Sequence, residues 1–179
     1  MIYVIIISIA LFPLVLAAHF NKRIREFWYA REFIFSETLF TRDPQLKNNI
    51  TKTLTKMADQ KKATSGSDVV RVLEVGPGTG SNFPYYPPGV RLTTIEMNGV
   101  LEQKAAQNVS QSPDLVIEER ISGNVEDMHM IRDEQFDAVV ATYVLCCFRD
   151  PARALREIHR VLTPVSCIRL YTSCLHPIV

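Results

Sequence analysis

Three glycines and two glutamates stand at spacings that could form a ligand site. Residues 72–80 read Val-Leu-Glu-Val-Gly-Pro-Gly-Thr-Gly, so a buried-strand pattern runs directly into a loop with glycine at every second position. Glycine in such a loop adopts positive φ without steric cost and lets the backbone pass close to a flat ligand. Glu74 lies two residues before the first of these glycines, and Glu96 lies 20 residues after it.

The two carboxylates favour a cationic ligand over a phosphate. A carboxylate repels a diphosphate but attracts an ammonium or a sulfonium group. The loop also departs from the dinucleotide pattern G-x-G-x-x-G, because Ser81 stands where that pattern has its third glycine. Pro84, Pro87 and Pro88 shorten the helix that would hold a pyrophosphate. An oxidoreductase that binds NAD is therefore disfavoured, while Glu96 is placed to take two ribose hydroxyls.

The elements that must position this loop alternate between strand and helix patterns. Repeated βα units predict an α/β fold, with a doubly wound, mainly parallel sheet and helices on both faces. Ligands of such sheets bind at the carboxyl ends of the strands, where the strand order reverses. The predicted strands are 69–75, 91–95, 115–119, 136–142 and 165–171, and the predicted helices are 44–62, 98–108 and one that starts at the capping pair Asp150-Pro151.

The N-terminus is predicted to be a membrane anchor at residues 1–20. Seventeen of these 20 residues are apolar and none carries a charged side chain. As a helix, the stretch to Ala18 would be about 27 Å long, near the thickness of a bilayer core. A cleaved signal peptide is disfavoured because no basic segment precedes the apolar run. Pro13 leaves open whether the anchor spans the bilayer or lies in one leaflet.

Residues 21–66 are predicted to form a basic, helical neck before a ligand-binding domain at 67–179. Residues 21–62 hold 10 basic and 5 acidic side chains, and positive charge on this side of the anchor places the domain in the cytosol. Ile24, Phe27, Trp28 and Ile34 follow helical spacing among charged residues. This helix either lies on the membrane surface or packs on the domain, and both interpretations stay open.

Composition excludes several other classes of protein. The whole-chain charge of +1 excludes a strongly basic nucleic-acid coat, so no nucleic-acid partner is expected. The four cysteines have no zinc-ligand spacing, so no metal site is predicted. The adjacent Cys146 and Cys147 are expected to be buried, reduced thiols.

The glycine loop and its acids resemble a known signature. The segment from Glu74 to Gly80, followed by Glu96, resembles the signature of class I S-adenosylmethionine-dependent methyltransferases. The sequence is more specifically similar to the membrane-anchored methyltransferase-like seven group, the microsomal alkyl thiol methyltransferases. The segments that carry these resemblances are 78–83, 86–89, 126–129, 136–140, 144–146 and 160–164, together with the apolar N-terminus.

The resemblance implies S-adenosylmethionine as the cofactor and assigns roles to individual residues. Glu74 would hold the methionine amino group, Glu96 would contact the ribose in place of the usual aspartate, and Met97 would pack on the adenine. Residues 124–125 would read the adenine edge, and Thr142 would face the methyl-transfer chamber. The candidate cofactor-binding residues are Glu74, Gly76, Pro77, Gly78, Thr79, Gly80, Glu96, Met97, Asn124, Val125 and Thr142.

The implied reaction is methylation of a small acceptor, such as an alkyl thiol, at an endoplasmic reticulum or lipid-droplet membrane. No catalytic base is assigned, because a sulfonium itself favours a nearby thiolate. His129 is interpreted as an ordinary loop residue, with proton acceptor as the alternative.

The family pattern continues past Pro164 into a fifth strand, which residues 165–171 can form, and then into two more strands with their helices, for which this sequence has no residues. We therefore expect a truncated or alternatively spliced product whose sheet is incomplete at the C-terminal edge. The alternative function is a catalytically compromised, membrane-tethered cofactor-binding or scaffold protein.

Overall fold

The chain folds into two compact units, Met1–Arg42 and Asp43–Val179. The computed structural model describes residues 21–40 and 44–171, so the predicted anchor at 1–20 lies outside the described residues. Helix α2 (Lys22–Phe40) belongs to the first unit, and every other described element belongs to the second. Among the described residues, no helix combines the length and the apolar character needed to cross a membrane.

The second unit is built on five strands that are all parallel. Their order in the sheet is β3-β2-β1-β4-β5. The direction of winding reverses between β1 and β4, so the loops that follow these two strands meet at the switch point of the sheet. The strands are β1 (Val70–Val75), β2 (Val90–Glu96), β3 (Val116–Ser122), β4 (Phe136–Thr142) and β5 (Leu162–Tyr171).

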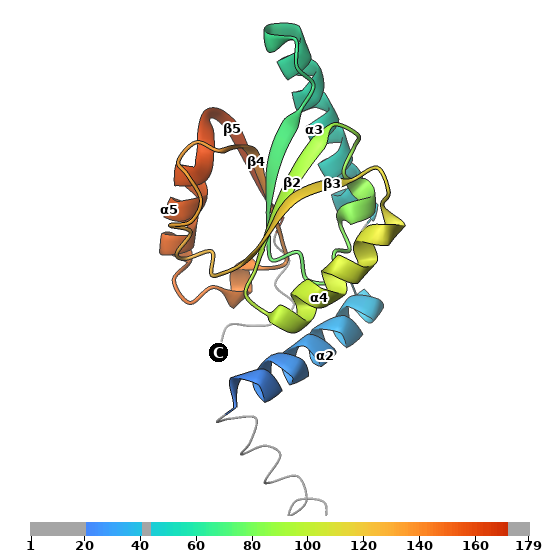
Figure 1. Cartoon of the computed structure of the whole chain (residues 1–179), viewed down its shortest axis with the longest axis vertical. Helices are drawn as coiled ribbons and strands as arrows, with labels where there is room; N and C mark the ends of the chain where they lie inside the picture. The colour runs from blue at the N-terminus through green and yellow to red at the C-terminus, as the bar shows by residue number, and fades with distance from the viewer. Residues whose placement is uncertain (1–20, 41–43, 172–179) are drawn as a thin grey trace, which may run out of the picture. The chain divides into compact units, whose positions relative to one another are not determined.

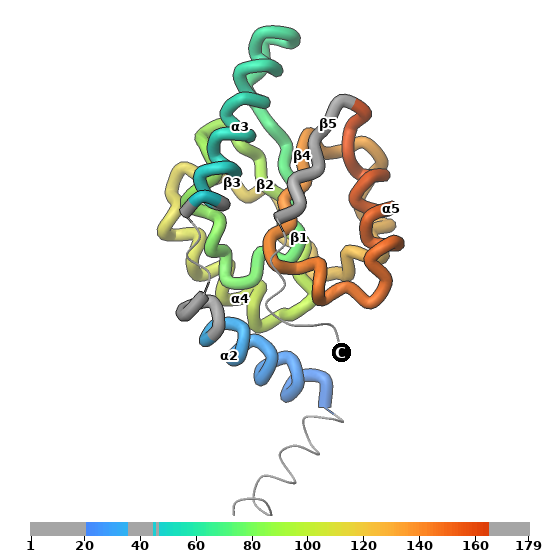
Figure 2. Tube along the Cα trace, turned by 180° about the vertical axis from the view of Figure 1, so that it is seen from behind, coloured from blue at the N-terminus to red at the C-terminus, as the bar shows by residue number. Residues whose placement is uncertain are grey.

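Helices lie on both faces of this sheet, as Figures 1 and 2 show for α3 and α5. The amide groups at the start of α4 donate to the Asn98 side chain, and Asp150 caps α5 in the same way through the Arg153 amide at 2.9 Å. The α-helices of this unit are α3 (Pro44–Ser65), α4 (Gly99–Asn108) and α5 (Pro151–Val161), and the 3-10 helices are η1 (Phe83–Tyr85), η2 (Val109–Gln111) and η3 (Leu145–Cys147).

Two apolar clusters hold the layers together, one on each face of the sheet. Ile50 and Leu54 of α3 are buried in a cluster with the even-numbered residues of β1, such as Val72. Ala154 and Ile158 of α5 are buried in the other cluster with the odd-numbered residues of β1 and β4. This alternation is what a central parallel strand covered on both faces requires. Helix α3 therefore contributes to the core of the second unit, although the sequence assigned residues 44–66 to the neck.

The predicted fold class is confirmed, with differences at element ends. The third strand extends to Ser122, three residues beyond its predicted end. The fifth strand starts at Leu162, directly after α5, and not at residue 165. After the glycine loop the chain forms only the three-residue 3-10 helix η1, as the three prolines around it predicted.

Candidate functional site

The glycine loop connects β1 to η1 at the carboxyl end of the sheet, and its glycines are needed for packing within the protein. Gly76, Gly78 and Gly80 have φ values of 63°, 58° and 81°, in the region that favours glycine. A Cβ on Gly76 would stand 2.5 Å from Cγ2 of Val144, and a Cβ on Gly80 would collide with the Phe83 ring. The loop can therefore pack closely on the segment that follows β4.

Glu74, two residues before the loop, is completely buried. Its Oε1 accepts a hydrogen bond of 2.7 Å from the Asn82 side-chain amide. Its Oε2 and the Tyr86 hydroxyl are buried without a hydrogen-bond partner among the described residues. Burial raises the pKa of Glu74 from 4.5 to about 7, and the Asn82 hydrogen bond, together with the polar Tyr86 hydroxyl nearby, opposes that rise. Glu74 is thus a buried acid with one oxygen left to bind a cationic or donor group.

Asn82 links the carboxyl ends of β1 and β4. Its Nδ2 atom donates to Glu74 and also, over 2.9 Å, to Oγ1 of Thr142. Both protons of the amide are therefore used, and Glu74, Asn82 and Thr142 form one hydrogen-bonded chain across the switch point. The sequence-based assignment of the site omitted Asn82, although it lies within the segment 78–83 that carried the family resemblance.

Glu96 closes β2 and joins the glycine loop to that strand. Its Oε1 accepts a bond of 2.8 Å from the Asn98 amide, and its Oε2 accepts one of 3.3 Å from the Gly78 amide. Burial raises the pKa of Glu96, and the backbone donors oppose the rise. The two predicted glutamates therefore lie on adjacent strands, each at or near the carboxyl end of its strand. The charge of Glu96 also raises the pKa of Glu74.

The remaining predicted residues occupy different environments. Pro77 and Thr79 are buried in the loop, where the Asn108 side chain of α4 donates to the Thr79 carbonyl over 2.9 Å. Met97 is 61% exposed, beside Glu96. Residues 124 and 125 lie in different environments. The Asn124 side chain is exposed, whereas Val125 is buried in the apolar cluster that contains Ala154 and Ile158 of α5. Only the backbone of Val125 could take part in a site.

Two further expectations are resolved by the loops after β3 and β4. The His129 side chain is 77% exposed and pairs with Asp127 at 3.1 Å, which agrees with an ordinary loop histidine. The expectation that Cys146 and Cys147 are buried is wrong, because both are exposed on η3. The strand β4 ends at Thr142, so these cysteines fall on a surface turn and not in the sheet.

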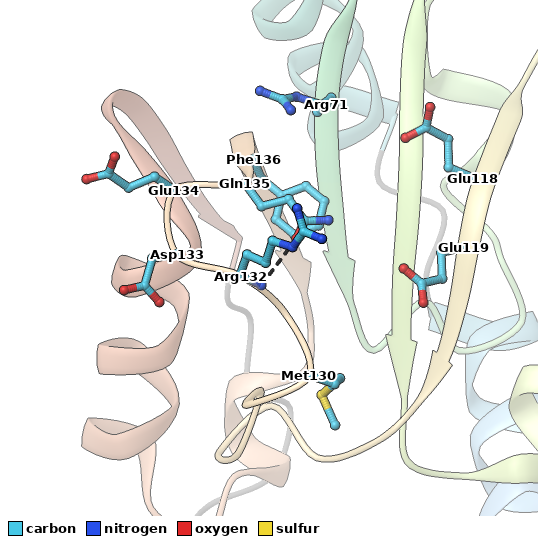
Figure 3. A pocket seen from close by; sticks show the side chains of 9 residues that line it. All are labelled: Arg71, Glu118, Glu119, Met130, Arg132, Asp133, Glu134, Gln135 and Phe136. Carbon is cyan, nitrogen blue, oxygen red and sulfur yellow. Dashed lines mark hydrogen bonds between the residues drawn. The ribbon is translucent and has the colours of Figure 1, made fainter.

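A charged hollow lies along the sheet, from Arg71 near the start of β1 to Met130 (Figure 3). Its volume is about 530 Å³, and it lies between two glutamates of β3 and the loop that leads into β4. None of the residues predicted to bind a cofactor lines it. Its lining residues are Arg71, Glu118, Glu119, Met130, Arg132, Asp133, Glu134, Gln135 and Phe136.

Comparison with known proteins agrees with the geometry at the switch point. Residues 73–168, more than half of the chain, match the family described as a methyltransferase domain. The chain belongs to this methyltransferase family. S-adenosylmethionine is the cofactor that this membership assigns to the chain.

Curated relatives of this methyltransferase include two human proteins. Thiol S-methyltransferase TMT1A of Homo sapiens is 41% identical over 98 residues, which cover 55% of this chain and 40% of that protein. Thiol S-methyltransferase TMT1B of Homo sapiens is 39% identical over 101 residues, which cover 56% of this chain and 41% of that protein. The matched part of the methyltransferase thus spans about two fifths of the length of these relatives.

Solved structures support the fold. The CurJ carbon methyltransferase superposes with a TM-score of 0.58 at 17% identity, covering 76% of this chain and 38% of that one. At that identity the likeness concerns the methyltransferase fold alone.

The residues at the switch point fit the cofactor that the family uses. Glu74 Oε2 is a buried acceptor without a partner among the described residues, which suits a cationic donor. Glu96 is a second carboxylate one strand away, where a sugar hydroxyl needs an acceptor. A diphosphate would meet two acids here, so the donor set of this methyltransferase favours a cation that carries a ribose.

Proposed function

We propose that the chain binds S-adenosylmethionine at the carboxyl ends of β1 and β2 and methylates a small thiol acceptor. The observation that carries this proposal is the pair of buried carboxylates on adjacent strands, one of which has an unpaired oxygen. A cation that bound at Glu74 would satisfy this oxygen and would keep the carboxylate ionised.

Each part of the site has a separate role in binding. Glu74 accepts the ammonium group of the ligand, and Asn82 keeps its carboxylate from turning away. Glu96 accepts the ribose hydroxyls while the amides of Gly78 and Asn98 hold it in place. Met97 offers an exposed apolar side chain to the adenine ring. Thr142, fixed by Asn82, lies at the end of β4, next to the proposed transfer chamber.

The chemistry needs alignment more than acid–base help. When bound, S-adenosylmethionine supplies a methyl group on a positively charged sulfur. The protein must orient the acceptor in line with that methyl group and exclude water, and the glycine loop and the turn after β4 provide the walls. A thiol acceptor reacts as the thiolate, so we assign no base among the described residues.

The thiol acceptor is supported by the names of the two human relatives. Because the match covers about two fifths of each of them, the activity and the acceptor are proposals for this chain. The alternative is a cofactor-binding or scaffold protein without transfer activity. It differs in one observable, since it would bind S-adenosylmethionine but release no methylated thiol.

We also propose that the protein works at a membrane, with residues 1–20 as its anchor in the lipid. The support is the run of 17 apolar residues in 20, followed at once by Lys22 and Arg23. The endoplasmic reticulum and lipid droplets are the proposed locations, with the methyltransferase domain on the cytosolic side. Microscopy of the tagged full chain, compared with a chain that lacks residues 1–20, tests this placement.

A thermal-shift titration with S-adenosylmethionine tests the binding claim. A ligand that binds the native state raises the midpoint by mass action. We expect a shift for the unchanged chain and for Glu119→Ala, an exposed carboxylate in the middle of β3, but little or no shift for Glu96→Ala. The absence of a shift in the unchanged chain would overturn the proposal. Mass spectrometry of an alkyl thiol incubated with the protein and S-adenosylmethionine then separates transferase from scaffold.

A further inference from the structure

Helix α2 carries an exposed aromatic stripe. Phe27 is 54% exposed, Trp28 is 39% exposed and Phe35 is 63% exposed. These residues and Ile24 recur at spacings of three, four and seven, so they share one side of the helix. Arg31 falls within the stripe, with its guanidinium 5.1 Å from the centre of the Trp28 ring. Three large aromatic side chains that lie together and exposed to water usually mark an interaction surface.

Basic residues gather at the start of the same helix. Lys22, Arg23 and Arg25 are exposed within its first turn, and only Lys22 has an acidic partner within the helix, Glu26 at 3.7 Å, in the part of the chain that the structure describes. Arginine and lysine stems can lie along an apolar surface while their charged ends reach phosphate groups. An aromatic stripe beside such residues is typical of a helix that lies in a membrane interface.

We propose that this stripe docks on the surface of an anionic lipid bilayer, with α2 lying in the interface plane. The charge at its start complements anionic headgroups, because basic residues are attracted to the negative surface of such a bilayer. The apolar run of residues 1–20 ends directly before α2 and so would bring the helix to the bilayer. A protein groove would also accept aromatic side chains, but it gives no reason for the arginines beside them. The inference rests on the proposed membrane anchor and does not depend on methyl transfer.

The only tryptophan of the chain, Trp28, lies in this stripe, so its fluorescence reports on this surface alone. The full chain is reconstituted in phosphatidylcholine vesicles with phosphatidylserine, using lipids brominated in the acyl chains as quenchers. The matched variant W28F/Y29W moves the tryptophan about 100° around the helix, to the position that stacks on Phe33. We expect a blue-shifted emission and strong quenching for Trp28, and at least twofold weaker quenching for the variant.

Equal quenching of the two proteins would overturn the proposal, because a tethered helix without a preferred side quenches both alike. Absence of quenching in both would also overturn it, and would favour a protein partner or packing on the domain. A second arm tests charge with R23Q/R25Q against R153Q/R156Q, a change of equal charge in α5. Replacing phosphatidylserine by phosphatidylcholine should weaken Trp28 quenching in the α5 variant but not in the α2 variant. Both proteins should keep their response to S-adenosylmethionine, so failure of docking is distinct from failure of the proposed function.

Discussion

At the scale of single residues, Glu74 combines a cost to stability with a proposed role in binding. The pKa of this buried acid rises from 4.5 to about 7, so the folded state holds a proton that the unfolded chain releases as the pH rises from 4.5. The contribution of Glu74 to the free energy of unfolding is therefore greatest below pH 4.5. It falls by about 3 kcal/mol between pH 4.5 and 7 and stays low above pH 7. Burial causes this cost, and it also leaves one oxygen of Glu74 without a partner among the described residues, where a cation would fit.

We expect Glu74→Gln to remove this pH dependence. The variant should match the unchanged chain near pH 4.5 and exceed its unfolding free energy by up to about 3 kcal/mol at pH 8, as measured by urea denaturation. It should also lose most of its affinity for S-adenosylmethionine in calorimetry, because the amide carries no charge. For the unchanged chain, affinity should increase with pH up to about 7, where Glu74 becomes ionised. A variant of equal stability at every pH would contradict the buried, protonated state.

Asn82 gives a second prediction at this scale. Asn82→Ala removes the donor to Glu74 and leaves a buried oxygen unsatisfied, so we expect a loss of about 1–3 kcal/mol in urea denaturation, larger above pH 7. Thr142→Val is the matched control, because it removes the other acceptor of the same amide and leaves the Glu74 bond intact. Its loss should be the smaller one. Equal losses would mean that Glu74 does not depend on Asn82.

At the scale of elements, the periodicity of the sequence predicted the bounds of a helix or strand correctly wherever that element had its own boundary signal. The pair Asp150-Pro151 located the start of α5, because a capping side chain acts within one turn. Strand β3 was predicted short since its side chains are mostly exposed and its pattern is weak. Its end at Ser122 depends on pairing with β2, a contact between distant segments that no local pattern contains.

The long loop between β3 and β4 is held by one arginine of α5. Arg160 donates to the carbonyls of Met128 and Ile131 and to the carboxylates of Asp133 and Glu157, over 2.6–3.0 Å. A loop that lacks regular backbone pairing needs such partners for its carbonyls. The contact explains why the loop stays packed against α5.

We expect Arg160→Ala to destabilise the protein by about 1–3 kcal/mol, because two carbonyls and two carboxylates lose their donor. Hydrogen exchange should rise first at the loop amides, including that of Met128, whose partner is Glu157. Arg156→Ala, an exposed arginine on the same helix, should change stability by less than about 0.5 kcal/mol. Similar effects from both variants would mean that loss of helix propensity, and not the loop contacts, explains the change.

At the scale of the whole molecule, the parallel sheet carries two regions with different chemistry. The carboxyl ends carry the glycine loop, Glu74 and Glu96, and these were predictable because a strand followed by such a loop has few other uses. The bridge through Asn82 and the inward turn of Val125 were not predictable, since both depend on which distant side chains fill the space. The charged hollow beside β3 has no local signature in the sequence, because its walls come from three separate segments.

The two faces of the sheet should contribute independently to the stability of the second unit. Leu54 of α3 and Ile158 of α5 are buried in different clusters, with the sheet between them. Leu54→Ala and Ile158→Ala should each cost about 2–5 kcal/mol, and their sum should match the double variant within about 0.5 kcal/mol in urea denaturation. Lys56→Ala, at an exposed position of α3, is the control and should be nearly neutral. A neutral Leu54→Ala would contradict the packing of α3 on the sheet. It would favour the assignment of residues 44–66 to the neck, as predicted from the sequence.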